Sequence, residues 1–446
     1  MATELALDSF FIMVAAVLVL FMQAGFAMLE VGFSRMKNAG AVMAKIFINL
    51  SVAAIVFWAV GWTLIYGGDN LGGWLGGFSQ AFYDMDFVGG GGDYSTFIET
   101  EEYNLIPGVD WFFQFAFAAV SLAIVWGTML DRTKFIGYVI FGAVFIALIY
   151  PTVAHWTWGG GWLAEEGFLD FAGSSIVHLC GATAALAGTL VLGPRIGKFR
   201  NGKAVPIPGH SMPLALLGIL ILWVGWMGFN GGSTLGAIEA DFGLVLANTN
   251  LAAAAGVIGA TIASLLVFRT LDVSQMGNGA IAGLVGITAP CAFIQPPWAV
   301  VVGLVAGLLV PPVVILLDKV LVDDPLGAIP AHGIAGIWGT LAIGLFGDPA
   351  LMDTGRGSLF DGAEGGQLWV QFYGVIATFV LVFIAAYVVF TAIKLTVGLR
   401  VTEEQEMLGL DISEHGMFGY PERFIEVTGA ESTSSDGSAP APAASE

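Results

Sequence analysis

The sequence predicts an all-α integral membrane protein that crosses the bilayer eleven times. Of its 446 residues, 57% are hydrophobic and only 11% are charged, whereas a soluble domain carries about 25% charged residues. The 62 glycines are a second indication, because small residues let transmembrane helices approach one another closely. Apolar stretches of about 20 residues, the length needed to span the hydrocarbon core, recur along most of the chain.

Short polar or glycine- and proline-containing breaks separate the predicted helices. The helices lie at about 9–32, 40–66, 111–130, 134–155, 173–193, 212–230, 244–269, 277–294, 298–317, 331–347 and 366–395. The count depends on dividing 277–317 at Gln295-Pro296-Pro297, since paired prolines interrupt helices. Glu4 and Asp8 stand where a signal peptide would carry basic residues, so we interpret the first helix as a retained span.

The distribution of charge predicts an external N-terminus and a cytoplasmic C-terminus. Lys and Arg concentrate in cytoplasmic loops, and with eleven spans fourteen of the 15 basic residues fall on one side, leaving only Arg356 on the other. The long loop at 67–110 contains no Lys or Arg. The formal net charge of −20 argues against nucleic acid as a partner, and a strongly acidic surface would suit a salt-rich habitat.

Composition also divides the chain into three parts. Residues 1–397 form the predicted transmembrane domain, in which two five-helix units at about 9–193 and 212–347 precede the last helix. Residues 398–427 are a polar cytoplasmic region. Residues 428–446 are rich in Ser, Ala, Pro and Asp, a composition typical of a disordered acidic tail.

A short repeated pattern is the strongest functional signal. The segment from Asp170 to His178 reads DFAGSSIVH, and the segment from Asp324 to His332 reads DPLGAIPAH. Each opens the fifth helix of its unit, and two units of five helices must run in opposite directions, as in transporters with inverted repeats and a midplane site. Ionisable residues inside spans usually face a pathway. The alternative is that each histidine serves packing by bonding a backbone carbonyl.

The acidic residue of each copy precedes its helix and is expected to cap free N–H groups there. Asp170 could also add negative potential at the external mouth, whereas Asp324 falls on the cytoplasmic side. We expect no metal and no cofactor, because two histidines supply too few ligands. Cys180 and Cys291 lie in apolar segments, where cysteine behaves as a small hydrophobic residue.

Five motifs, in order over nearly the whole chain, resemble the ammonium transporter family. They are QAGFAMLEVGFSRMKN from Gln23 to Asn38, WGGG from Trp158 followed by the Asp170–His178 segment, GWMGFNGGS from Gly225 to Ser233, the segment around Asp324 and His332, and the region from Thr396 to Asp411. The region around His415 departs from the family pattern. The tail after Thr428 has no counterpart in it.

The resemblance implies a homotrimer in the cell membrane with one narrow pore in each subunit. It implies that Phe117, Trp158 and Ser233 recruit ammonium outside, that Phe117 and Phe229 form a stacked gate, and that His178 and His332 line the pore. Asp170 would organise the recruitment site from beneath. A PII-type signalling protein is the regulator that the family implies on the cytoplasmic side.

The mechanism we expect is recruitment of NH4+, loss of a proton, passage of NH3 and reprotonation inside, with or without separate proton movement. The aromatic faces of Phe117 and Trp158 can attract a small cation, and Ser233 can accept an N–H, which potassium cannot offer. Two alternatives stay open: a Rhesus-type channel for neutral gas, and an ammonium sensor that signals through its tail. We do not expect an enzyme, because no nucleophile motif, metal cluster or cofactor loop occurs in the sequence.

Overall fold

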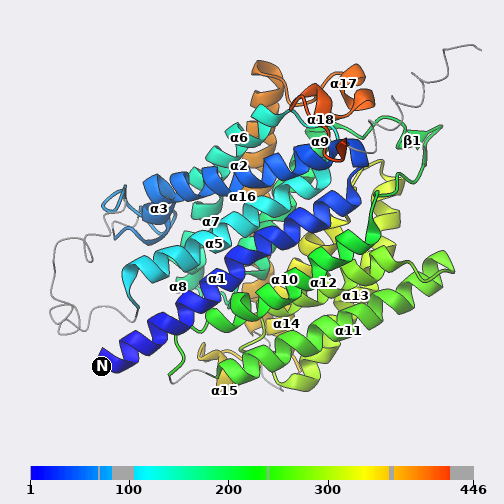
Figure 1. The fold of residues 1–446 in the computed structure, drawn as a ribbon. Coiled ribbons are helices and arrows are strands. Elements are labelled where there is room, and N and C mark those ends of the chain that lie inside the picture. The colour runs from blue at the N-terminus through cyan, green and yellow to red at the C-terminus, as the bar shows by residue number, and fades with distance from the viewer. Residues whose placement is uncertain (1, 69–70, 83–104, 239–240, 361–365, 422–446) are drawn as a thin grey trace, which may run out of the picture.

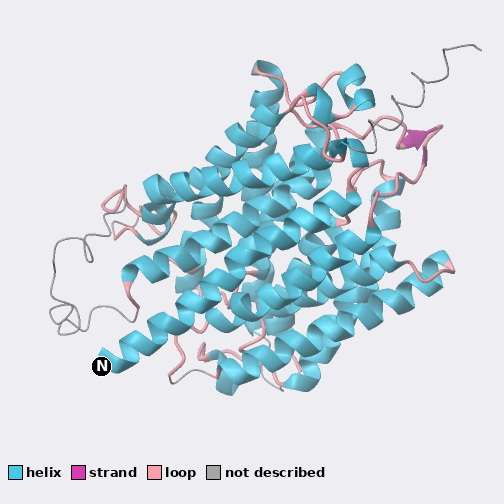
Figure 2. Ribbon diagram, in the orientation of Figure 1, coloured by secondary structure: helices cyan, strands magenta, loops and turns pink. Residues whose placement is uncertain are grey.

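The computed structural model describes residues 2–68, 71–82, 105–238, 241–360 and 366–421. These residues form a bundle of long helices (Figure 1). Among them, the only strands are β1 (Phe199–Arg200) and β2 (Lys203–Ala204), which pair in a small antiparallel hairpin at one end of the bundle (Figure 2). The predicted all-α class is therefore confirmed.

The first half of the chain contains five long helical segments, several of them interrupted by a π-helical or 3₁₀ turn. The segments are α1 (Ala2–Phe33); η1 (Met36–Asn38), α2 (Ala39–Val56), η2 (Phe57–Gly61) and α3 (Trp62–Tyr66); α5 (Pro107–Trp126) and η3 (Gly127–Met129); α6 (Phe135–Val144), η4 (Phe145–Ile149), α7 (Tyr150–Thr157) and α8 (Trp162–Glu165); and η5 (Ser174–Leu179) with α9 (Cys180–Leu192). Each corresponds to one of the predicted spans.

The second half contains the remaining long helices and the short helices of the C-terminal region. They are α10 (Met212–Gly232), α11 (Phe242–Phe268), α12 (Val273–Thr288), α13 (Pro296–Lys319), η6 (Ile329–Ile334) with α14 (Ala335–Phe346), α15 (Pro349–Met352), α16 (Gly366–Thr396), α17 (Glu403–Leu408) and α18 (Leu410–Ser413). Among the described residues, ten helices are long and apolar enough to cross a membrane. The predicted span at 277–294 corresponds to α12, which has 16 residues and is the short one.

Close approach between helices explains much of the glycine content. The bundle packs α1 against α10, and α11 against both α12 and α13. A Cβ atom at Gly303 would collide with the carbonyl of Ala252, and one at Gly307 would collide with the carbonyl of Gly256. These α11–α13 contacts therefore require glycine, as expected where backbones pack directly in a bilayer.

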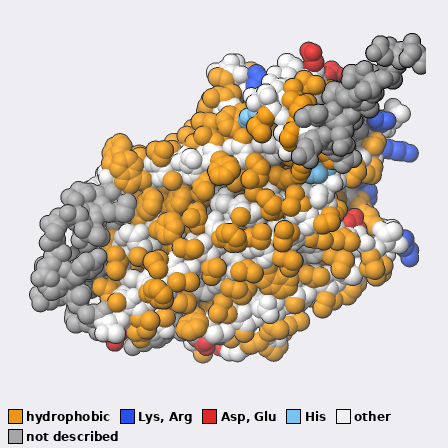
Figure 3. All heavy atoms as spheres, in the orientation of Figure 1, with side chains coloured by type: hydrophobic (Ala, Val, Ile, Leu, Met, Phe, Trp, Pro, Cys, Tyr) orange, Lys and Arg blue, Asp and Glu red, His pale blue; other side chains and the backbone are white. Residues whose placement is uncertain are grey.

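The outer surface of the bundle is that of a multi-pass membrane protein. Figure 3 shows hydrophobic side chains covering most of one face. Large apolar residues on several helices are exposed, including Leu266, Val388 and Leu395, the last with 79% of its surface exposed. Such extensive apolar exposure is unfavourable in water, and it is matched to lipid.

The C-terminal region lies at one end of the bundle, which we call the tail side. There α18 packs against α2 and η1, and the β1–β2 hairpin lies at the same end, whereas the start of α1 lies at the opposite end (Figure 1). The predicted tail at 428–446 and the central part of the predicted loop at 67–110 are outside the described residues.

Candidate functional site

Two histidines meet at the centre of the candidate site. His178 stands on the π-helical turn η5, and His332 stands on the π-helical turn η6. Their Nδ1 atoms are 3.2 Å apart, and the two rings are stacked with centroids 5.3 Å apart. Both side chains are buried. One ring can donate and the other accept at this contact, because a neutral imidazole carries one donor and one acceptor.

Asp170 fixes the turn that carries His178. Its Oδ1 accepts the N–H groups of Gly173 and Ser174 at 3.0 and 2.8 Å, and its Oδ2 accepts those of Ser175 and Ile176 at 2.8 and 2.9 Å. All four are N–H groups that a helix start leaves unpaired. Burial raises the pKa of Asp170 to about 6, although these N–H bonds oppose the shift.

Asp324 makes the same kind of contact before His332. Its Oδ1 accepts the N–H groups of Gly327 and Ala328 at 2.9 and 3.0 Å, and its Oδ2 accepts that of Ile329 at 2.8 Å. The two copies of the sequence pattern thus have the same geometry at the third, fourth and fifth residues after the aspartate. Burial raises the pKa of Asp324 as well.

Aromatic rings lie directly next to His178. The rings of Phe117 and Phe229 stack with centroids 4.0 Å apart and an interplanar angle of 24°, and both residues are fully buried. The His178 ring lies 5.5 Å from Phe229 and stacks on Trp226 at 5.0 Å. The stacked phenylalanines therefore separate the histidines from the next compartment.

That compartment is a pocket of about 170 Å³, which we call the Trp158 pocket. Its lining residues are Tyr66, Asp110, Phe113, Gln114, Phe117, Trp158, Phe171, Ser233 and Leu235. The structure therefore brings together Phe117, Trp158 and Ser233, the three residues for which the family resemblance implies recruitment. The Trp158 indole N–H donates to the backbone carbonyl of Asp170 at 2.9 Å, so the segment that carries His178 also orients Trp158.

Asp110 and Tyr66 also line this pocket and were not predicted as site residues from the sequence. Asp110 lies in the first turn of α5, and Tyr66 ends α3. Asp110 Oδ1 and the Tyr66 hydroxyl are shielded atoms without a hydrogen-bond partner among the described residues. An acidic residue inside an apolar span indicates a functional site. The predicted span began at 111, however, and so left Asp110 in the preceding loop.

On the other side of the histidines, His332 lines a small cavity of about 20 Å³. A cavity needs about 10–15 Å³ to hold one water, so one water-sized molecule fits there. Glu30 lines the same cavity and forms a buried ion pair with Lys45. Beyond it, a hollow of about 630 Å³ opens on the tail side and shares Asn278 and Leu326 with the small cavity.

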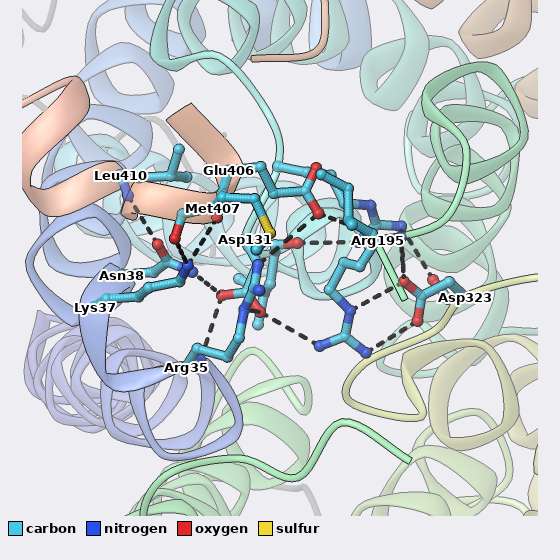
Figure 4. A network of polar contacts seen from close by, with 12 residues as sticks. Arg35, Lys37, Asn38, Asp131, Arg195, Asp323, Glu406, Met407 and Leu410 are labelled. Atoms are coloured by element: carbon cyan, nitrogen blue, oxygen red, sulfur yellow. Dashed lines mark hydrogen bonds and ion pairs between the residues drawn. The ribbon is translucent and has the colours of Figure 1, made fainter. Parts of the chain in front are cut away.

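A polar network joins the tail side of the bundle to the C-terminal region (Figure 4). Arg195 makes two bonds to Asp323, from Nε and Nη2, at 3.0 Å each, and reaches Asp131 at 3.3 Å. Burial alone would raise the pKa of Asp323, but Arg132 and Arg195 outweigh it and lower this pKa to about 2. Asp323 therefore remains ionised at all physiological pH values.

Glu406 carries the network into α17. Its buried carboxylate accepts the N–H of Ile196 at 2.7 Å and pairs with Arg400 at 2.7 Å. Lys37 donates to the carbonyls of Glu406 and Met407 (Figure 4). The C-terminal region is thus anchored by buried charged groups and not by apolar contact alone.

Comparison with known proteins places this geometry in context. The model of the Ammonium Transporter Family matches residues 10–420. The chain belongs to the ammonium transporter family. It is 41% identical over 433 residues to the ammonium transporter Amt2 of Archaeoglobus fulgidus, an alignment that covers 94% of this chain and 89% of that protein.

Two solved structures of family members have the same fold. A protein described as a sensor Amt protein is 33% identical, with a TM-score of 0.84 and coverage of 93% of this chain and 99% of that one. Mep2 of Candida albicans is 28% identical, with a TM-score of 0.78 and coverage of 90% and 87%. Among the described residues of this ammonium transporter family member, no group of three or more His, Cys, Asp or Glu side chains could hold a metal ion.

Proposed function

We propose that this protein recruits NH4+ in the Trp158 pocket, removes a proton and conducts NH3 past two histidines. The observation that carries the proposal is a continuous order of compartments. A pocket with Trp158 and Ser233 is followed by the stacked Phe117 and Phe229 rings, and then by the paired histidines. Membership of the ammonium transporter family supports ammonium as the substrate.

Recruitment rests on the chemistry of the pocket wall. Trp158 and Phe117 present aromatic rings, and a cation over such a face gains about 2 kcal/mol or more when it is desolvated. Ser233 donates its hydroxyl proton to the Phe229 carbonyl at 2.8 Å, so its oxygen lone pairs are free to accept an N–H. An ammonium ion offers N–H donors to that oxygen and potassium offers none.

Deprotonation follows from the aromatic barrier. A bare ion in a medium of low dielectric constant costs tens of kcal/mol in the idealised Born limit, and the apolar rings of Phe117 and Phe229 lie stacked on one another, with the His178 ring next to Phe229. Neutral NH3 avoids that penalty, and the proton that NH4+ loses is either released to water on the external side or moves separately to the tail side. The His178–His332 contact uses the two Nδ1 atoms, so the two Nε2 atoms, one an acceptor and the other an N–H donor, are left to hydrogen-bond NH3 within the buried passage. Reprotonation takes place on the tail side.

Saturable uptake tests this proposal against a Rhesus-type channel for neutral gas. We expect wild-type proteoliposomes to take up methylammonium with saturation at low concentration, and Trp158→Leu to weaken that saturation strongly. Non-saturable uptake that is unchanged in Trp158→Leu would instead favour passage of neutral gas.

A sensor function is the second candidate, and the structural similarity to a sensor Amt protein favours considering it. In that case ammonium would occupy the Trp158 pocket and change the contacts of α17 with little flux. Binding without uptake in the same proteoliposomes would support this alternative. Sustained uptake of many methylammonium ions by each protein molecule would exclude it.

The membrane topology belongs to the same proposal. We infer eleven spans, with α12 as the short eighth one, two inverted units of five helices, an external N-terminus and a cytoplasmic C-terminus. The gathering of Lys and Arg on the tail side supports this orientation. Cysteine labelling of residues on α8 and α17 in sealed cells tests it, because only the external position should react with an impermeant reagent.

We infer the remaining assignments from the family. Residues 1–397 form the transport domain and 398–427 the regulatory region, the protein is a homotrimer, and a PII-type protein binds its cytoplasmic face. The polar anchoring of α17 through Glu406 supports a structured regulatory region. Native mass spectrometry of the detergent-solubilised protein tests the trimer, and the addition of a purified PII-type protein tests the partner.

A further inference from the structure

Asp110 is a carboxylate without a counter-ion in the Trp158 pocket. Of the residues that line the pocket, it alone is charged, and no Lys or Arg in the described part of the chain pairs with it. Its Oδ1 is shielded from solvent and unpaired, as is the nearby Tyr66 hydroxyl. Buried polar groups in native proteins nearly always have partners, so two orphan groups in one pocket require an explanation.

The position of Asp110 in the first turn of α5 offers a structural explanation, since a carboxylate stabilises a helix N-terminus. That explanation is incomplete. A carboxylate that caps a helix accepts N–H groups with its oxygens, as Asp170 does with both of its own. Asp110 Oδ1 accepts none, and the side chain that hydrogen-bonds this carboxylate, Gln114, is a neutral amide and not a counter-ion.

Asp170, the other acidic residue near the Trp158 pocket, cannot pair directly with a cation in that pocket. Both oxygens of Asp170 already accept two backbone N–H groups each, beneath the pocket. Asp170 is also absent from the lining of the pocket, whereas Asp110 is part of it. A cation that enters the pocket therefore meets the carboxylate of Asp110 and not that of Asp170.

We propose that Asp110 is the counter-ion of the cation in the Trp158 pocket, with the Tyr66 hydroxyl as an additional acceptor. This inference rests on the proposed function. Asp110, Tyr66 and Ser233 offer three acceptors, and the face of Trp158 offers a fourth contact. This set matches the four N–H donors of an ammonium ion. It also suits methylammonium, whose methyl group would lie against the aromatic wall.

The test measures methylammonium binding by calorimetry on the detergent-solubilised protein, together with uptake by proteoliposomes. We expect Asp110→Asn to raise the dissociation constant at least about tenfold, the effect of losing one charge-assisted hydrogen bond. Tyr66→Phe, which removes a single oxygen, should raise it a few-fold. Melting temperatures of both variants show whether they are folded.

Glu165→Gln is the matched control. Glu165 is exposed and follows Trp158 by seven residues, so the change removes the same charge without touching the pocket. We expect its dissociation constant to stay within twofold of wild type. An equal weakening in Glu165→Gln and Asp110→Asn would overturn the proposal, because a general surface potential would then explain both.

The outcomes separate this inference from the proposed function. If wild type takes up methylammonium with saturation and Asp110→Asn binds it as tightly as wild type does, Asp110 serves only α5, and the inference fails while the function stands. If wild type binds no methylammonium at millimolar concentration, the recruitment site and the inference fail together.

Discussion

The ion pair between Glu30 and Lys45 gives a prediction whose magnitude follows from burial. Each side chain is only 1% exposed. Glu30 lies on α1 and Lys45 on α2, so the pair links these two helices. Replacing Lys45 with Met leaves a buried carboxylate without its partner, and breaking a buried pair in this way costs about 3–5 kcal/mol. Lys45 Nζ also lies 5.7 Å from the centre of the Tyr138 ring, and the loss of that contact adds little.

Replacing both partners should restore most of that loss. Glu30 has one oxygen without a hydrogen-bond partner, so the pair is incompletely satisfied in the native protein. Removing an ion pair of this kind in favour of apolar residues is often neutral or stabilising. We therefore expect Glu30→Met with Lys45→Met to melt close to wild type, and each single variant to melt well below it.

The assay is a double-mutant cycle on thermal unfolding in mild detergent. The matched control is Lys198→Met with Asp318→Asn, which removes a partly exposed pair on the tail side, with side chains 12% and 32% exposed. Exposed pairs contribute about 0–1 kcal/mol, so this control should hardly change the melting temperature. If single Lys45→Met is as stable as wild type, the pair is not buried as described and the reasoning is wrong.

Three further predictions concern the acidic residues. The pKa of Asp323 in the folded protein is about 2, below the ordinary 3.8. Its ionised form therefore stabilises the fold by about 2 kcal/mol above pH 4, and this stabilisation is lost as the pH falls through 2. When the free energy of unfolding is measured against pH, this acid-induced loss should be absent in Asp323→Asn. Asp170→Asn leaves two backbone N–H groups facing an amide nitrogen, whereas Asp324→Asn leaves one. Methylammonium uptake should therefore fall further in Asp170→Asn than in Asp324→Asn. Equal losses of uptake in the two variants would contradict this. Glu406→Gln weakens the ion pair to Arg400, and limited proteolysis should then cut the C-terminal region sooner than in wild type.

The helices were predicted well because two local features of the sequence determine them: the length of each apolar stretch and the polar or proline-containing breaks between stretches. Apolar length located the helices, and the break at Gln295 was correct, since Gln295 precedes the first residue of α13. The ends were less accurate. α5 starts at Pro107 instead of 111, because proline is favoured in the first turn of a helix. α12 runs from Val273 to Thr288, so the predicted span at 277–294 began and ended too late in the sequence.

The site was predictable only where the sequence repeats or resembles known motifs. The pairing of His178 with His332 followed from two matched patterns, and the structure brings their rings together. Asp110 and Glu30 could not be assigned in this way. Each is a single carboxylate, and its significance depends on neighbours distant in the sequence: Trp158 for Asp110, and His332 for Glu30.

The central claim is that His178 and His332 lie on the path of the transported molecule. Its most direct test records ammonium-evoked current together with methylammonium uptake in proteoliposomes of wild type, His178→Ala and His332→Ala. We predict that both variants lose flux or selectivity, while binding at the Trp158 pocket changes little, because Phe117 and Phe229 separate the two sites. Unchanged flux and selectivity in both variants would contradict the pathway proposed here.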